Sequence, residues 1–168
     1  NKSESKQQED HYLQQSTDLP NSALSIHNWV QASPYTDQIS VRHIATGPIN
    51  VNLNYNLSGE EARSMAVYLK KAAHMVESQE KPDDSPFYNP NIGSVKNRSD
   101  GADLKTEIAM GMEDGIVMLM HTGHADNQPG INQKMTINDA RTMADMFEAA
   151  AQELDVELSS ESGMEPNN

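Results

Sequence analysis

The chain has 168 residues, a formal net charge of −13 and no cysteine. This length suits one ordinary domain or two small fused halves, and the lack of cysteine excludes a disulfide framework and thiolate chemistry. The acidity disfavours a nucleic-acid partner, because phosphate backbones are usually bound by a basic surface. No apolar run approaches the roughly 20 residues of a membrane helix, so we expect a soluble protein with no membrane partner.

Composition divides the chain into five parts. Residues 1–22 are polar and charged, which predicts a disordered polar tail. Residues 23–77 hold an N-terminal segment and a first folded unit, and 78–104 collect turn formers typical of a linker or long loop. A second folded unit is expected over 105–158, followed by a disordered acidic tail at 159–168.

The first folded unit begins with strand-like sequence. Residues 49–57 alternate apolar side chains with Asn50, Asn52, Asn54 and Asn56, a period of two that predicts one face in the core and one in water. A preceding strand over 38–45 and a turn at Thr46-Gly47-Pro48 complete a hairpin.

A helix is predicted after this hairpin, and a similar segment recurs 78 residues later. Ser58 with Glu61, and Thr136 with Asp139, have the spacing of a capping box at a helix start. Apolar residues follow each cap at helical spacing, which predicts two buried helical faces. The identical pairs in the two segments are Ala62/Ala140, Arg63/Arg141, Met65/Met143, Ala66/Ala144, Ala72/Ala150 and Ala73/Ala151.

The second unit has its own hairpin. Strand-like residues 106–112 and 116–121 flank Glu113-Asp114-Gly115, whose Asp-Gly pair is a strong turn signal. We therefore predict an α+β fold of two β-β-α repeats that form an antiparallel sheet with two helices on one face. The alternative assembly is a homodimer in which each half completes its core with a second copy.

One predicted strand is apolar on both faces. Val117, Met118, Leu119 and Met120 follow one another, so if helices cover one face the other needs a second cover. Residues 23–30 are one candidate cover, and a partner protein or second subunit is the other. These four residues are accordingly candidate interaction residues, as are Asn50, Asn52 and Asn54, whose amides can both donate and accept hydrogen bonds.

A histidine-containing loop is the candidate metal site. His121, His124 and Asp126 combine two imidazoles with a carboxylate, which can bind a divalent ion if the loop folds the ligands inward. The spacing matches no strong metal motif, and an ordinary solvated loop is the simpler interpretation. We therefore expect no cofactor, with a divalent metal as the alternative.

The sequence favours a non-enzymatic protein-interaction module that acts through its sheet face or acidic surface, for example as an inhibitor that imitates nucleic acid. Its expected partner is a protein, basic if the acidic surface binds it. The alternatives are a metal-binding protein or metal-dependent enzyme using His121, His124 and Asp126, and a structural subunit of a larger assembly. The compartment stays open, because a signal upstream of Asn1 could have been removed. Of the possible compartments, the cytoplasm is slightly favoured.

Overall fold

The computed structural model describes most of the chain, namely residues 11–15, 25–33, 36–47, 50–78, 91–99, 102–111, 115–123 and 132–164. In this part, four strands precede a helix, and the same order then recurs. The elements are β1 (His11–Gln15), β2 (Ser25–Ser33), β3 (Gln38–Thr46), β4 (Val51–Leu57), α2 (Gly59–Glu77), β5 (Asn91–Ser99), β6 (Ala102–Met110), β7 (Ile116–Gly123), β8 (Asn132–Thr136) and α3 (Ile137–Met164).

The strands pair in sequence order from β1 to β8, and every pairing is antiparallel. The junction between β4 and β5 is narrow, since its register consists of the single pair Asn56 and Arg98. The strands on either side of this junction are paired along most of their length. The sheet therefore consists of two four-stranded halves, β1–β4 and β5–β8, joined at one point.

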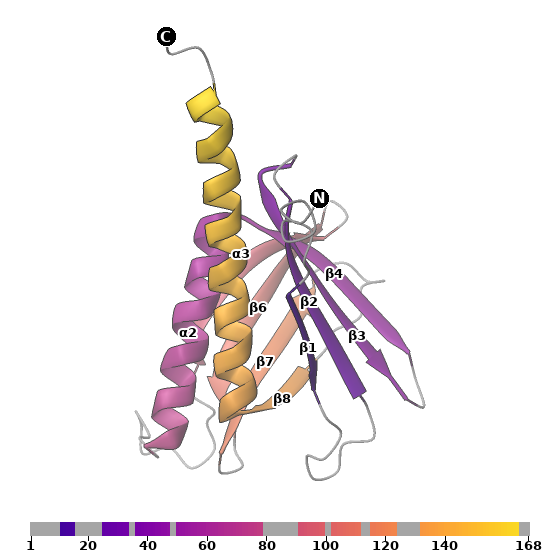
Figure 1. The fold of residues 1–168 in the computed structure, drawn as a ribbon. Helices are drawn as coiled ribbons and strands as arrows, with labels where there is room; N and C mark the ends of the chain where they lie inside the picture. The colour runs from indigo at the N-terminus through magenta and orange to yellow at the C-terminus, as the bar shows by residue number, and fades with distance from the viewer. Residues whose placement is uncertain are drawn as a thin grey trace.

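The two helices lie side by side and run in opposite directions (Figure 1). Helix α2, which follows the first half, packs mainly against β5, β6 and β7, whereas α3 packs mainly against β1 and β2. Each helix therefore covers strands of the other half, so neither half buries its apolar surface alone.

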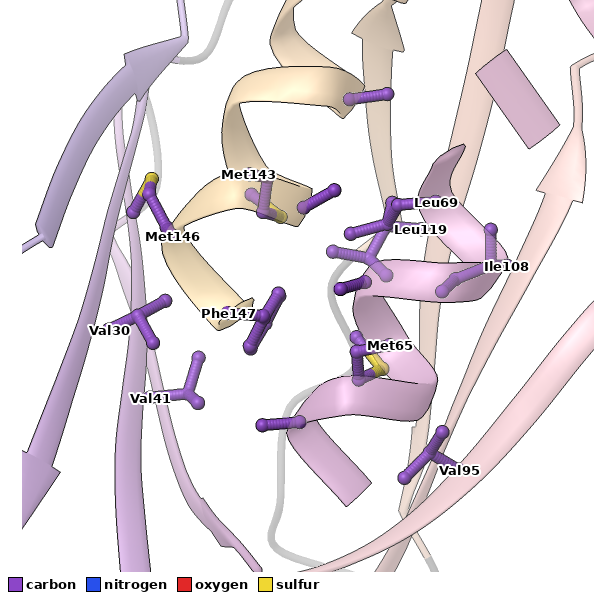
Figure 2. Packing of buried hydrophobic residues seen from close by; sticks show 14 of the residues in the cluster. Val30, Val41, Met65, Leu69, Val95, Ile108, Leu119, Met143, Met146 and Phe147 are labelled. Carbon is purple, nitrogen blue, oxygen red and sulfur yellow. The ribbon is translucent and has the colours of Figure 1, made fainter. Parts of the chain in front are cut away.

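The core lies between the helices and the inner sheet face (Figure 2). Met65 and Leu69 of α2 and Met143 and Phe147 of α3 are all fully buried. They meet apolar residues from both halves of the sheet, such as Val30 of β2. Alanines at the remaining inward positions of both helices are also fully buried, which allows close packing.

Both helices start at the predicted caps. The Ser58 hydroxyl accepts from the Glu61 N–H at 3.1 Å, and the Glu61 carboxylate accepts from the Ser58 N–H at 2.8 Å, which is a complete capping box. At α3, the Thr136 hydroxyl accepts from the Asp139 N–H at 3.1 Å. The helix starts predicted from the 78-residue shift are confirmed.

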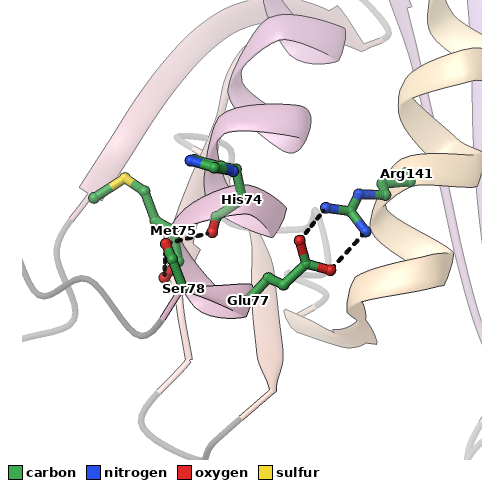
Figure 3. A network of polar contacts seen from close by, with 5 residues as sticks. All are labelled: His74, Met75, Glu77, Ser78 and Arg141. Atoms are coloured by element: carbon green, nitrogen blue, oxygen red, sulfur yellow. Dashed lines mark hydrogen bonds and ion pairs between the residues drawn. The ribbon is translucent and has the colours of Figure 1, made fainter.

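Ionic contacts connect the exposed sides of the helices, and three of them are also hydrogen bonds. Arg141 donates through both terminal nitrogens to Glu77, each at 3.1 Å (Figure 3), and Arg63 donates to Asp155. The two arginines, Arg63 and Arg141, are 78 residues apart in the sequence, and so are the two acids, Glu77 and Asp155. Lys70 donates to Glu148 at 2.7 Å, and these two positions are themselves 78 residues apart.

The Tyr68 side chain of α2 lies very close to the backbone of β5 at Gly93. A Cβ atom at Gly93 would lie only 2.4 Å from Cγ of Tyr68. Because real Cβ atoms do not approach other atoms so closely, the absence of a side chain at Gly93 leaves the space that the Tyr68 ring occupies. The register shift of β5 against β6 occurs between Asn91 and Gly93, next to this contact.

The α+β class, with antiparallel strands and two helices, agrees with the sequence prediction. The predicted β-β-α unit differs from the structure, in which four strands precede each helix. Strand β1 lies within the predicted tail 1–22, β5 and the start of β6 lie within the predicted linker 78–104, and α3 continues to Met164 within the predicted tail 159–168. These strands are polar, and pairing with neighbouring strands outweighs their weak local propensity. Neither helix of the described residues is both long enough and apolar enough to cross a membrane.

Candidate functional site

The outer face of strands β2, β3 and β4 is the most distinctive surface of the described chain. Burial alternates along these strands, which separates the core-facing residues from an outer set. We call this outer set the amide face. It comprises Ser25, His27, Trp29, Gln31, Ser33, Gln38, Ser40, Arg42, Ile44, Thr46, Asn52, Asn54 and Asn56.

The amide face contains no carboxylate, although the chain has 25 Asp and Glu residues. Its one formal charge is the guanidinium of Arg42, which is exposed. The outer face of β5–β8 continues this trend, because its described side chains include Lys96, Lys105 and Lys134 but only one acid, Glu107. The described side chains on the outer side of the sheet therefore carry a net positive charge in a protein that is strongly acidic overall.

Hydrogen bonds orient the side chains of the amide face. The Arg42 Nε donates to the Asn54 Oδ1 at 3.1 Å, and the Ser40 hydroxyl donates to the Asn56 Oδ1 at 3.2 Å. In both pairs the carboxamide oxygen is the acceptor, and both hydrogen bonds connect residues that lie directly opposite each other on β3 and β4.

An aromatic pair lies beside Arg42. Trp29 is directly opposite Arg42 in the register of β2 and β3. Its indole is half-buried and stacks on the His27 ring, with centroids 5.9 Å apart and planes 20° apart. Trp29 is also the single tryptophan of the chain, so a flat aromatic surface and a cation lie next to each other on the amide face.

The acidic helices offer a weaker candidate surface. Glu148 and Asp155 of α3 contact Lys70 and Arg63 of α2, and Glu77 of α2 contacts Arg141. Hydrogen bonding to the Arg141 guanidinium lowers the pKa of Glu77. Several carboxylates that a phosphate-like track would require are therefore already paired within the protein.

A buried polar network lies at the contact between the two halves. The Nδ1–H of His43 donates to the Asn28 Oδ1 at 2.6 Å, and the His43 Nε2 is 2.7 Å from the Tyr55 hydroxyl. The Thr106 side chain hydrogen-bonds to Tyr55 and lies 3.0 Å from the Nδ1 of His121. All five side chains are essentially inaccessible to solvent.

Donor and acceptor capacity fix the direction of this network. Because the Asn28 oxygen only accepts, His43 carries its proton on Nδ1 and accepts the Tyr55 proton at Nε2. The Tyr55 oxygen then accepts from Thr106, and Thr106 accepts from the Nδ1–H of His121. The Nε2 of His121 is left as a buried acceptor, and it has no hydrogen-bond partner within the described structure.

Both histidines of the network are neutral. Burial, reinforced by the neighbouring His121, holds the pKa of His43 well below its usual value. Burial alone lowers the pKa of His121 to about 3 and raises the pKa of Tyr55. These shifts follow from the cost of placing a charge where no water can solvate it. The network consequently holds the halves together as neutral dipoles.

The residues at this contact occupy equivalent positions in the two halves. Asn28, His43 and Tyr55 of the first half correspond, at a shift of 78, to three residues of the second half: Thr106, His121 and Gln133. Gln133 replaces the tyrosine and is fully buried, and neither polar atom of its side chain has a partner among the described residues.

The predicted interaction residues divide between the two sides of the sheet. Val117 and Leu119 are fully buried beneath the helices, whereas Met118 and Met120 are half-buried on the outer side. Asn52 and Asn54 belong to the amide face, and Asn50 is exposed just before β4.

The predicted metal ligands are only partly within the described structure. His121 belongs to the buried network, while His124 and Asp126 lie outside the described residues. No cluster of three or more His, Asp or Glu side chains suited to a metal ion occurs in the described part of the chain.

Sequence reasoning missed Trp29 and Arg42 as surface residues and His43 and Tyr55 as a buried network. The 78-residue shift contained a usable signal, because it pairs His43 with His121. Comparisons with protein-family models, with curated proteins and with solved structures found no match to this chain.

Proposed function

We propose that this protein is a non-enzymatic interaction module that binds a partner protein through the amide face. The observation that carries the proposal is the complete absence of carboxylates from this face in a chain of net charge −13. A surface that serves only for solubility would carry the acidic residues that predominate elsewhere in the chain.

The composition of the amide face supports the same proposal. Protein interfaces are enriched in tryptophan and arginine, and these residues frequently carry most of the binding energy. Trp29 and Arg42 lie directly opposite each other on neighbouring strands. The surrounding amides and hydroxyls supply hydrogen bonds around this pair.

We also infer that the chain is a fused pair of β-β-β-β-α units. Support comes from the recurring element order and from the equivalent positions of the helix caps, ionic pairs and buried histidines. The amide face belongs to the first half, and its equivalent in the second half carries lysines and methionines instead. Functional specialisation of one half is consistent with this difference.

A comparative pull-down tests the binding proposal. The full chain, Arg42→Glu and Lys71→Glu serve as baits in lysate of the source cells, and bound proteins are identified by mass spectrometry. Lys71 is exposed on α2, so its variant matches the change in net charge on the opposite side of the molecule. We expect a protein that the wild-type and Lys71→Glu baits capture and the Arg42→Glu bait loses.

Other results with these variants would place binding on another surface or identify a second copy as the partner. Equal capture by all three baits, or loss only with Lys71→Glu, would assign binding to another surface. Light scattering of the purified chain tests whether the partner is a second copy. A mass doubling at high concentration that Arg42→Glu abolishes would identify the interface as a homodimer contact.

A further inference from the structure

We infer that the partner protein of the amide face is a second copy of this chain, which lies face to face with the first across a two-fold axis. This inference rests on the proposed function and specifies its partner. Three observations carry it: the charges of the described surface, the residue pairs across β2 and β3, and the area of the face.

The charges of the described surface favour the amide face as the contact between two copies. Each copy has a net charge of −13, so two copies repel each other most where carboxylates meet carboxylates. The helix side carries exposed carboxylates, among them Glu77 and Asp155, and the outer face of β5–β8 carries Glu107. Of these three described surfaces, the amide face is the one on which two copies meet without bringing carboxylates together.

The register of β2 and β3 makes the amide face complementary to itself. Trp29 of β2 lies directly opposite Arg42 of β3. A two-fold axis that runs between these two strands, parallel to them, places Trp29 of each copy against Arg42 of the other. A guanidinium over an indole ring is a favourable cation–π contact, and the symmetry forms this contact twice.

The same axis pairs the polar residues of the two strands. Gln31 lies opposite Ser40 in the register, and Ser33 lies opposite Gln38. Each of these carboxamides therefore meets a hydroxyl of the other copy. Carboxamides and hydroxyls both donate and accept hydrogen bonds, so these pairs need no counter-charge. The arrangement gives complementary groups at successive outer positions along both strands.

The area of the face predicts a weak, reversible dimer. Strands β2 and β3 have nine residues each and β4 has seven. At about 3.4 Å per residue and about 4.8 Å per strand, the three strands cover about 30 by 14 Å, or about 400 Å² of flat area in each copy. Stable interfaces bury about 800 Å² per partner, and transient ones bury less. We therefore expect an equilibrium between monomer and dimer that depends on protein concentration.

Sedimentation equilibrium of the purified full chain, at a series of protein concentrations and at low and high salt, tests the inference. We expect the mass to rise from one chain towards two as the concentration rises. Added salt should strengthen the dimer, because it screens the repulsion between two acidic copies. Arg42→Glu should weaken the dimer about tenfold or more, because two cation–π contacts are lost. Lys71→Glu, the same charge change on exposed α2, should alter it by less than about twofold at high salt.

A mixture of two variants tests the reciprocal contact. Trp29→Ala and Arg42→Ala each remove both Trp29–Arg42 contacts from their own homodimer, whereas a mixed dimer keeps one of them. An equimolar mixture should therefore contain more dimer than either variant alone at the same total concentration. A general loss of stability in either variant does not produce this result. Circular dichroism of each variant establishes that the fold is intact.

Other results overturn the inference. A chain that stays monomeric at every concentration, a dimer that Arg42→Glu leaves intact, or a dimer that weakens as salt is added would show that two copies do not meet through the amide face. A mixture that associates no more than its components would refute the two-fold pairing of Trp29 with Arg42. A monomeric chain that still captures another protein in an Arg42-dependent way would overturn this inference and leave the proposed function standing.

Discussion

The rings of His43 and His121 meet at a tilt across the contact between the two halves, with centroids 4.7 Å apart and planes inclined at 38°. They come from β3 and β7, which are not neighbours in the sheet. The inner faces of the halves therefore meet directly at these rings. Tyr55 lies against both rings, with its centroid 5.3 Å from each of theirs. This contact leads to predictions about pH and about single residues.

Acid should destabilise the fold through these two histidines. The unfolded chain binds a proton at each histidine below its ordinary pKa of 6.5, whereas folded His121 stays neutral to about 3 and folded His43 also titrates well below 6.5. Stability is therefore fully present above about pH 6.5 and falls as the pH drops. The slope is about 1.4 kcal/mol per pH unit for each neutral histidine.

Urea unfolding at a series of pH values measures this effect. His121→Gln removes one contribution, so its free energy of unfolding should fall less steeply between about pH 6 and pH 4, the difference in slope being about 1.4 kcal/mol per pH unit. Parallel curves for the variant and the wild type would contradict the assigned neutral state of His121.

Two equivalent positions should respond in opposite ways to loss of their polar group. Tyr55→Phe removes the hydroxyl that donates to His43, so a buried acceptor loses its donor, at a cost of about 1–3 kcal/mol. Gln133→Leu removes a buried amide that has no partner in the described part of the chain, so it should be neutral or stabilising. Denaturant midpoints of the two variants provide the comparison, and a strongly destabilised Gln133→Leu would show that the amide is satisfied in solution.

Gly93→Ala should destabilise the packing of α2 on β5. The added methyl would overlap the Tyr68 ring, and overpacking of this kind costs about 1–3 kcal/mol. A double-mutant cycle with Tyr68→Ala isolates the contact, because the methyl should be tolerated better once the ring is absent. If Gly93→Ala costs the same in both backgrounds, the cause is the strand backbone and not the ring.

Replacing Lys70 with an acid should destabilise the helix pair. Lys70→Glu places a carboxylate beside Glu148 and Asp145, where Lys70 now forms ionic contacts at 2.7 and 3.8 Å. Thermal unfolding should shift to lower temperature, and the reciprocal change Glu148→Lys should restore part of the loss. Additive effects of the two changes would indicate that this exposed pair contributes nothing measurable.

The sequence predicted the parts of the fold that local patterns encode. The hydroxyls of Ser58 and Thr136 and the apolar helical spacing after them gave both helix starts, and the alternation before Leu57 gave β4. Strand β5 escaped prediction because Asn91–Ser99 has little apolar periodicity, and its place depends on pairing with β6. Such pairing energy is tertiary and leaves little trace in a single sequence.

The candidate site could be predicted only in part. The Asn row on β4 was visible from its period of two, but Trp29 and Arg42 become neighbours only through the β2–β3 register. The net charge of −13 predicted an acidic surface without locating it, and the described structure has carboxylates on the helix side but none on the amide face. Composition gives the total charge and carries no information about where those charges lie.

The contact between Lys70 and Glu148 also distinguishes a pair of unlike halves from a pair of like halves. These two positions are equivalent, so two copies of the first half arranged in the same way would bring lysine against lysine. Two copies of the second half would bring glutamate against glutamate, with Asp145 adding a further negative charge. At this position opposite charges meet only when a first half joins a second half, whereas the arginine contacts with Glu77 and Asp155 have equivalents in a pair of like halves. The Lys70–Glu148 position is therefore the one helix contact of the three whose charges favour the association of unlike halves.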